Sequence, residues 1–311
     1  MSARKTSPPN PSPSPGDGLD LEESRRFCKR LATSHYENFL VASILLPRRF
    51  RQPFYSIYAF CRTADDVADE SGSPERALAG LEKLQNSVDA MFGKVRCGFS
   101  GVPGTECRVD NLFPALSDTV ATFELDKQPF DDLLSAFRQD QHCVEYESES
   151  QLLDYCRRSA NPVGRMLLQL AGCCDDENAA LSDEICTGLQ LANFWQDVSR
   201  DHAIGRIYLP RDQREAFGVS PASLAGSTTP PSLRKLLCEL CSRAEAHFRR
   251  GLPLADRVPS WLSSDIKLFA HGGLATLNAI RRIDFDCLRV RPKVSKTTQL
   301  SLVARAVLGW L

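Results

Sequence analysis

Two clusters of polar and acidic residues carry the clearest chemical signal in this sequence. The first holds Asp65 and Asp69, and the second holds Asn193, Asp197 and Asp201. Residues four apart lie on one face of a helix, with Cβ atoms roughly 5–6 Å apart. Each cluster therefore predicts a row of side-chain oxygens along one helix. Two like charges at this spacing cost a helix about 0.2–0.5 kcal/mol, so the pattern indicates that a cation neutralises them.

The type of ligand atom points to a particular cation. Carboxylate and amide oxygens suit Mg²⁺, which commonly also binds the phosphate oxygens of a substrate. The alternative is that each cluster is a solvated helix face, but the spacing occurs twice and both clusters lie among apolar and aromatic residues. The sequence thus predicts a Mg²⁺ site for a diphosphate substrate, with the ligands Asp65, Asp69, Asn193, Asp197 and Asp201.

Arg62 lies three residues before Asp65 and therefore on the same helix face. A planar guanidinium matches phosphate oxygens two at a time, so we expect Arg62 to contact the diphosphate. The alternative is a salt bridge within the helix, to Asp65 or Asp66. By contrast, we expect three later basic residues to lie on a solvated surface: Arg289, Arg291 and Lys293.

Three segments resemble the signatures of the squalene/phytoene synthase family. Residues 35–39 (HYENF) and 58–66 resemble the first signature, and residues 190–210 resemble the second. Residues 155–164 also fit the family pattern. The resemblance covers nearly the whole chain after residue 19. In HYENF and in NFWQDVSRDHAIGRIYLP it is strongest to the bacterial hydroxysqualene synthase branch, which belongs to hopanoid and squalene biosynthesis.

This resemblance implies an all-α fold, a single isoprenoid-synthase-type helical bundle around a central cavity. Two aspartate-rich helices would face each other across the cavity mouth. The catalytic residues it implies are Asp65, Asp69, Asp197, Asp201 and Arg62, and Asn193 would complete the metal ligands. The substrate-binding residues it implies are His35, Tyr58, Arg62, Tyr155, Gln190, Arg206 and Tyr208.

The resemblance also implies a reaction, the conversion of presqualene diphosphate and water to hydroxysqualene and diphosphate. Gln196 supports this choice, because several relatives that condense two prenyl diphosphates carry arginine at that position. The first alternative is head-to-head condensation of two farnesyl diphosphates to presqualene diphosphate, squalene or dehydrosqualene, and phytoene synthesis comes after it. A non-catalytic scaffold is a distant alternative, since such relatives lose acidic ligands that this sequence keeps.

The elements that must position these residues are helices. Residues 53–70 place apolar side chains at helical spacing, and Ser73-Pro74 predicts the start of a helix over 74–92. Residues 93–110 lack periodicity and predict a loop. No convincing strand pattern occurs, so we expect one all-α domain over residues 20–311. The other expected helices are 21–33, 112–125, 129–143, 149–171, 182–201, 231–251, 261–288 and 296–308.

Composition limits the remaining possibilities. Residues 1–19 are rich in Pro and Ser and predict a disordered tail without a secretory signal. A formal net charge of −1 argues against a nucleic-acid partner. The 12 cysteines show no disulfide or zinc pattern and indicate reduced thiols in the cytoplasm. Residues 300–311 are amphipathic, and we favour packing on the bundle over peripheral contact with the inner membrane. A presqualene diphosphate synthase would be the partner that hands over the substrate.

Overall fold

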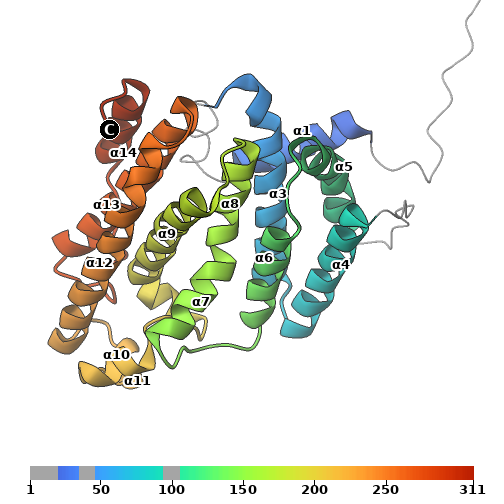
Figure 1. Cartoon of the computed structure of the whole chain (residues 1–311). Coiled ribbons are helices and arrows are strands. Elements are labelled where there is room, and N and C mark those ends of the chain that lie inside the picture. Colours follow the sequence, from blue (N-terminus) through green and yellow to red (C-terminus); the bar gives the residue numbers. More distant parts are fainter. Residues whose placement is uncertain (1–19, 35–45, 94–105) are drawn as a thin grey trace, which may run out of the picture.

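The computed structural model describes residues 20–34, 46–93 and 106–311, and the side chains of all of these except 106–110 (Figure 1). The predicted all-α class is confirmed. Within the described ranges no β-strand occurs, and a single parallel bridge joins Glu145 to Ile207. The predicted tail over residues 1–19 and the substrate-binding candidate His35 lie outside the described residues.

Helices of the first half of the chain pack side by side on one side of the molecule (Figure 1). Those of the second half lie on the other side, with α9 and α8 between the two groups. The first half contains α1 (Leu21–Ser34), α3 (Arg48–Glu70), α4 (Pro74–Phe92), α5 (Glu106–Phe123), α6 (Gln128–Gln139), α7 (Glu149–Ser159) and α8 (Asn161–Leu170). The second half contains α9 (Asp176–Ala203), α10 (Arg211–Ala216), α11 (Pro221–Leu224), α12 (Pro231–Gly251), η1 (Leu252–Asp256), α13 (Ser260–Arg282) and α14 (Lys296–Val307).

Two of the expected helices have the predicted bounds. The Ser73 side chain accepts a hydrogen bond from the backbone N–H of Arg76, and Pro74 begins α4. A hydroxyl at this position satisfies a backbone donor that has no partner within the helix. The other exact match is α12, which begins at Pro231 and ends at Gly251.

Other boundaries differ from the prediction. The single helix expected over residues 149–171 is two helices, α7 and α8, because the chain breaks at Ala160 and a new helix begins at Asn161 with Pro162 in its first turn. The helix expected over 261–288 ends at Arg282, because Asp284 and Phe285 adopt positive φ angles of 51° and 57°. The expected loop over 93–110 already contains the start of α5.

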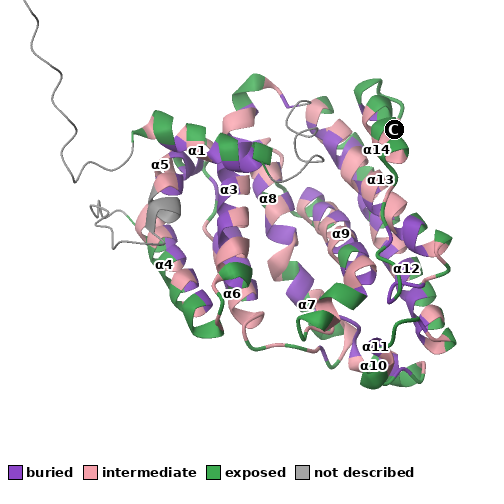
Figure 2. Ribbon diagram, turned by 180° about the vertical axis from the view of Figure 1, so that it is seen from behind, coloured by how far each residue is buried: buried purple, intermediate pink, exposed green. Residues whose placement is uncertain are grey.

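The buried side chains form two clusters, one in each half of the bundle. Helices α3, α5 and α6 supply much of the first cluster, and α9, α12 and α13 supply much of the second. Trp261 at the start of α13 packs against both clusters and stacks on Phe50 of α3, with ring centroids 4.5 Å apart. Figure 2 shows that the buried faces of the helices point toward one another. Trp261 thus connects the two clusters and packs the start of α13 on α3.

Within the described residues the structure holds neither a disulfide nor a helix that could span a membrane. The described cysteines are all free thiols. None of the described helices is both long enough and apolar enough to cross a membrane.

Candidate active site

The first acidic cluster lies near the C-terminal end of α3. Arg62 donates to Asp65 at 3.0 Å and forms an ion pair with Asp66 at 2.5 Å. The salt bridge within the helix, which the sequence left as the alternative, is therefore present in the structure. Tyr58, one turn before Arg62, is half-buried.

The second cluster lies along α9. Asp197 forms an ion pair with Arg291, whose Nη2 donates to Asp197 Oδ2 at 3.0 Å and whose Nε contacts Oδ1. The Arg291 side chain is 37% exposed, in line with the expected surface position, but the segment after α13 carries it back to α9, where it pairs with Asp197. Gln196 holds this segment in place, since its side-chain amide donates to the carbonyl of Pro292 at 2.7 Å. The absence of arginine at 196 therefore carries less weight for the reaction, because Arg291 brings positive charge to Asp197.

Arg206 joins the two acidic clusters. After α9 the chain turns at Gly205, where φ is +82°, and the backbone N–H of Arg206 donates to the carbonyl of Asp201 at 2.8 Å. Glycine suits this left-handed turn because it has no Cβ. The Arg206 guanidinium then donates to Asp69 Oδ1 on α3 at 2.9 Å. Arg206 therefore links the end of α9 to Asp69 on α3.

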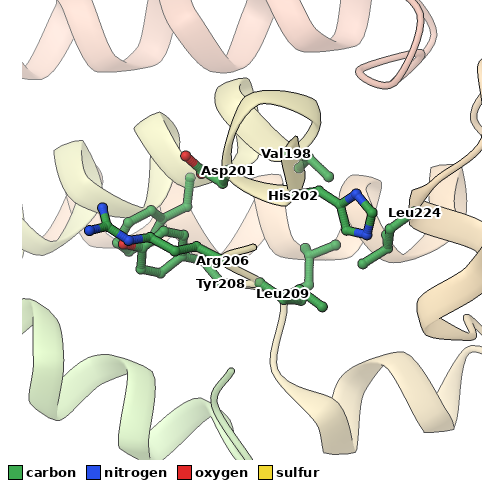
Figure 3. A pocket seen from close by; sticks show the side chains of 9 residues that line it. Val198, Asp201, His202, Arg206, Tyr208, Leu209 and Leu224 are labelled. Carbon is green, nitrogen blue, oxygen red and sulfur yellow. The ribbon is translucent and has the colours of Figure 1, made fainter. Parts of the chain in front are cut away.

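A small pocket lies between the C-terminal part of α9 and the segment that follows this helix. Asp201, Arg206 and Tyr208 line it together with Phe194. In Figure 3 the first three gather at one end of the pocket, and His202 lies at the other end.

The electrostatics of the two carboxylate rows fit a cation site. Partial burial and the neighbouring Asp69 raise the pKa of Asp65 to about 6. Burial and the neighbouring Asp197 raise the pKa of Asp201 to about 7. Like charges disfavour ionisation in this way until a positive charge compensates them. The oxygen donors suit Mg²⁺, although no three His, Cys, Asp or Glu side chains of the described part already surround one point. Arginines neutralise Asp69 and Asp197 instead.

Tyr155 and Tyr208 belong to an aromatic cluster beside Arg206. Phe194 stacks on Tyr208, with ring centroids 3.8 Å apart. Tyr155 packs against both rings and against Tyr146. These side chains form an apolar wall with hydroxyl groups next to the acidic residues.

A cavity of about 530 Å³ lies between α9, α13 and α14. Asn193 lines it, whereas Gln190 is not among its lining residues. The polar side includes Asn193, Gln196, Arg291 and Lys293, and the apolar side includes Leu189, Leu268, Phe269 and Val303. Lys293 lines this cavity and is also exposed, so its expected place on a solvated surface is not contradicted.

One polar residue of this region was missed in the sequence. Asp140, at the end of α6, accepts a hydrogen bond from the Tyr155 hydroxyl at 2.7 Å. The charges of Arg206, Asp69 and Asp65 act on its carboxyl group. Asp140 belongs to no repeated spacing in the sequence. Its place beside Tyr155 is therefore seen only in the folded structure.

Known proteins resemble this chain over most of its length. The squalene/phytoene synthase family model matches residues 32–298. The chain belongs to the squalene/phytoene synthase family. This family consists of enzymes that act on prenyl diphosphates, so the expected substrate class is confirmed at the level of the family.

Individual members of the family differ in their named reactions. A hydroxysqualene synthase from Rhodopseudomonas palustris is 34% identical over 230 residues, covering 74% of each chain. Phytoene synthase 3 from Zea mays is 30% identical and covers 95% of this chain and 68% of its own. The crystal structure of squalene synthase HpnC from Alicyclobacillus acidocaldarius is 40% identical, covers 86% of this chain and 96% of its own, and gives a TM-score of 0.77.

Proposed function

We propose that this family member converts presqualene diphosphate and water to hydroxysqualene and diphosphate, a step of squalene and hopanoid biosynthesis. The observation that carries the proposal is the Arg206–Asp69 ion pair at 2.9 Å, which joins the two acidic segments beside the aromatic cluster. The 34% identity to a hydroxysqualene synthase supports this choice of reaction.

We propose Mg²⁺ as the cofactor. When bound, it would supply positive charge that stabilises the departing diphosphate. The residues that would hold it are Asp65, Asp69, Asn193, Asp197 and Asp201.

The chain's own groups would bind and protect the reacting molecule. Arg62, Arg206 and Arg291 already face carboxylates in the site and would turn their guanidinium groups to phosphate oxygens. The faces of Tyr155, Tyr208 and Phe194 would stabilise a carbocation, because aromatic rings present negative potential on their faces. The apolar wall of the cavity would limit the access of water.

Head-to-head condensation of two prenyl diphosphates is the second candidate. Arg291, Lys293 and Lys296 line one cavity and could neutralise a second diphosphate. The phytoene synthase relative, at 30% identity over 95% of this chain, also favours this reaction.

A product assay separates the two candidates. The purified protein receives Mg²⁺ without NADPH, and presqualene diphosphate or farnesyl diphosphate is supplied in separate reactions. We expect hydroxysqualene from presqualene diphosphate, with loss of at least about 1,000-fold in rate in Asp65→Ala and Asp197→Ala. Asp132→Ala is the matched control, because Asp132 lies on α6 and accepts from Gln128. Condensation of farnesyl diphosphate instead would refute the first proposal, and no turnover of either by folded protein would favour a scaffold.

We also propose peripheral contact with a cytoplasmic membrane surface. Residues 287–311 contain the basic side chains Arg289, Arg291, Lys293, Lys296 and Arg305 and no acidic ones. Leu300 and Trp310 are 71% and 69% exposed, whereas Leu302 and Val303 of the same segment line the cavity. The segment therefore packs on the bundle and also presents apolar groups outward. A presqualene diphosphate synthase at the same surface would supply the substrate.

A further inference from the structure

Asp140 is a carboxylate whose two oxygens have different surroundings. Its Oδ2 accepts a hydrogen bond from the Tyr155 hydroxyl at 2.7 Å. Its Oδ1 is buried and has no hydrogen-bond partner within the described ranges. A buried acceptor without a partner costs roughly 1–3 kcal/mol, and a donor brought by a bound molecule would remove that cost. Oδ1 thus has an unused capacity to accept a hydrogen bond.

The groups around Asp140 keep it a base at neutral pH. Burial raises the pKa of Asp140 to about 6, the Tyr155 hydrogen bond and the charge of Arg206 oppose the rise, and Asp69 and Asp65 add to it. Burial and the charge of Asp140 hold the pKa of Tyr155 well above its ordinary value, so its hydroxyl stays protonated. The hydroxyls of Tyr146 and Tyr208 face the same carboxyl group and show the same direction of shift. Asp140 is therefore ionised at pH 7 and close to its titration range, as efficient proton acceptors are.

The proposed reaction releases one proton, and the other carboxylates of the site are less suited to take it. The bond between carbon and the diphosphate oxygen breaks, and its electron pair leaves with the diphosphate. The water oxygen then bonds to the cationic carbon and must lose a proton to become a hydroxyl group. Asp69 and Asp197 are paired with arginines, and Asp65 and Asp201 are proposed to hold the cation.

We propose that Asp140 is the general base that accepts this proton on Oδ1. The Tyr155 hydroxyl is a positioning group, because it holds Oδ2 and so fixes the direction of Oδ1. This role rests on the proposed function.

The test compares Asp140→Asn with the control Asp132→Asn on the same helix, using Mg²⁺ and presqualene diphosphate. Diphosphate release and hydroxysqualene are measured in the same reaction, with the rate recorded from pH 5 to pH 9. In Asp140→Asn we expect alcohol formation to fall by at least about 100-fold and diphosphate release to fall less. The missing alcohol should appear as hydrocarbon products, formed when the released diphosphate takes a proton from carbon. In the control Asp132→Asn we expect one molecule of hydroxysqualene for each diphosphate released.

A second variant reports on the positioning role. Tyr155→Phe removes the hydrogen bond that lowers the pKa of Asp140, so the acidic limb of the rate profile should move to higher pH. The Mg²⁺ concentration for half-maximal rate should stay unchanged in Asp140→Asn, since Asp140 is not a proposed ligand.

Three results would overturn the assignment. They are an unchanged ratio of alcohol to diphosphate in Asp140→Asn, a tenfold higher Mg²⁺ requirement, or an acidic limb that stays in place in Tyr155→Phe. Wild-type protein that forms no alcohol would instead refute the proposed function, so the two failures are distinguishable.

Discussion

Asp265 is a carboxyl group that lies inside the bundle without a described partner. It is 3% exposed, and its Oδ1 is buried without a hydrogen bond in the described part of the chain. Trp261 and Phe269, one helical turn to either side on α13, pack against the first core cluster. Burial raises the pKa of Asp265 to about 8, whereas an unfolded chain leaves it near 3.9. The folded protein therefore holds a proton here that the unfolded chain releases above about pH 4.

This difference predicts how stability depends on pH. Because the pKa of Asp265 is higher in the folded protein than in the unfolded chain, its contribution to the free energy of unfolding is complete below about pH 4. That contribution is lost as the pH rises to about 8, by up to roughly 1.4 kcal/mol per pH unit. Asp265→Asn cannot ionise, so its free energy of unfolding relative to wild type should rise by on the order of 3 kcal/mol from pH 5 to pH 8. Urea denaturation at both values measures this, with Asp132→Asn as control. Equal differences at the two pH values would contradict the prediction.

At the residue scale, the spacing of residues in the sequence predicted site residues only where the same spacing occurs twice. Asp65, Asp69 and Asp201 were predicted to act together, and Arg206 brings their segments into contact. Asp140 could not be predicted from spacing, because a single acidic residue at a helix end usually faces water. Its importance depends on burial beside Tyr155, which only the packed structure provides.

Helices α8 and α9 approach each other closely at Gly164. A Cβ atom added there would lie 2.3 Å from Ser182 Oγ and 2.7 Å from Cys186 Sγ. Both distances are shorter than a normal contact, so the Ser182 and Cys186 side chains would have to rotate or one helix would have to shift. The absence of a side chain at Gly164 therefore sets how α8 packs on the helix that carries Asp197.

Gly164→Ala should lower the free energy of unfolding by about 1–3 kcal/mol, because overpacking outweighs the gain in helix propensity. Gly272→Ala is the matched control, since an added Cβ on this α13 glycine meets no atom within 4 Å. The control should be neutral or more stable by up to about 1 kcal/mol. Thermal or urea unfolding measures both. A stabilised Gly164→Ala would show that the α8–α9 contact adjusts without cost.

Helix ends were predictable where a local signal marks them. Ser73-Pro74 gives α4 its N-terminus because a hydroxyl caps the first turn and proline needs no hydrogen-bond partner there. The end of α13 was not predictable, because Asp284 and Phe285 adopt positive φ angles that residues other than glycine rarely adopt. That turn directs the following segment back to α9, and Arg291 reaches Asp197 as a result.

For the molecule as a whole, the basic side chains of residues 287–311 and the outward apolar groups of residues 300–311 predict binding to anionic lipid. Basic side chains near such a surface contribute about 1 kcal/mol each, and buried apolar side chains add to this. Vesicles of phosphatidylglycerol should therefore bind the protein more strongly than vesicles of phosphatidylcholine. Replacing Leu308 and Trp310 together by Ser should weaken binding by roughly 10-fold or more.

Cosedimentation with vesicles measures this binding. Val144→Ser is the control, because Val144 is 59% exposed and lies between α6 and α7, outside residues 300–311. Equal binding to both lipids would contradict the contribution of charge. Unchanged binding of the double variant would contradict the apolar contact.

The ion pairs of Arg206 with Asp69 and of Arg291 with Asp197 have a consequence for the order of events at the site. In each pair the arginine neutralises the aspartate. A diphosphate would attract the arginine, and a metal ion would attract the aspartate. An anion that draws the arginines away frees the aspartates, and a metal ion that draws the aspartates away frees the arginines. We therefore expect the two proposed ligands to be heterotropically coupled, and by thermodynamic reciprocity each would strengthen the binding of the other by the same factor.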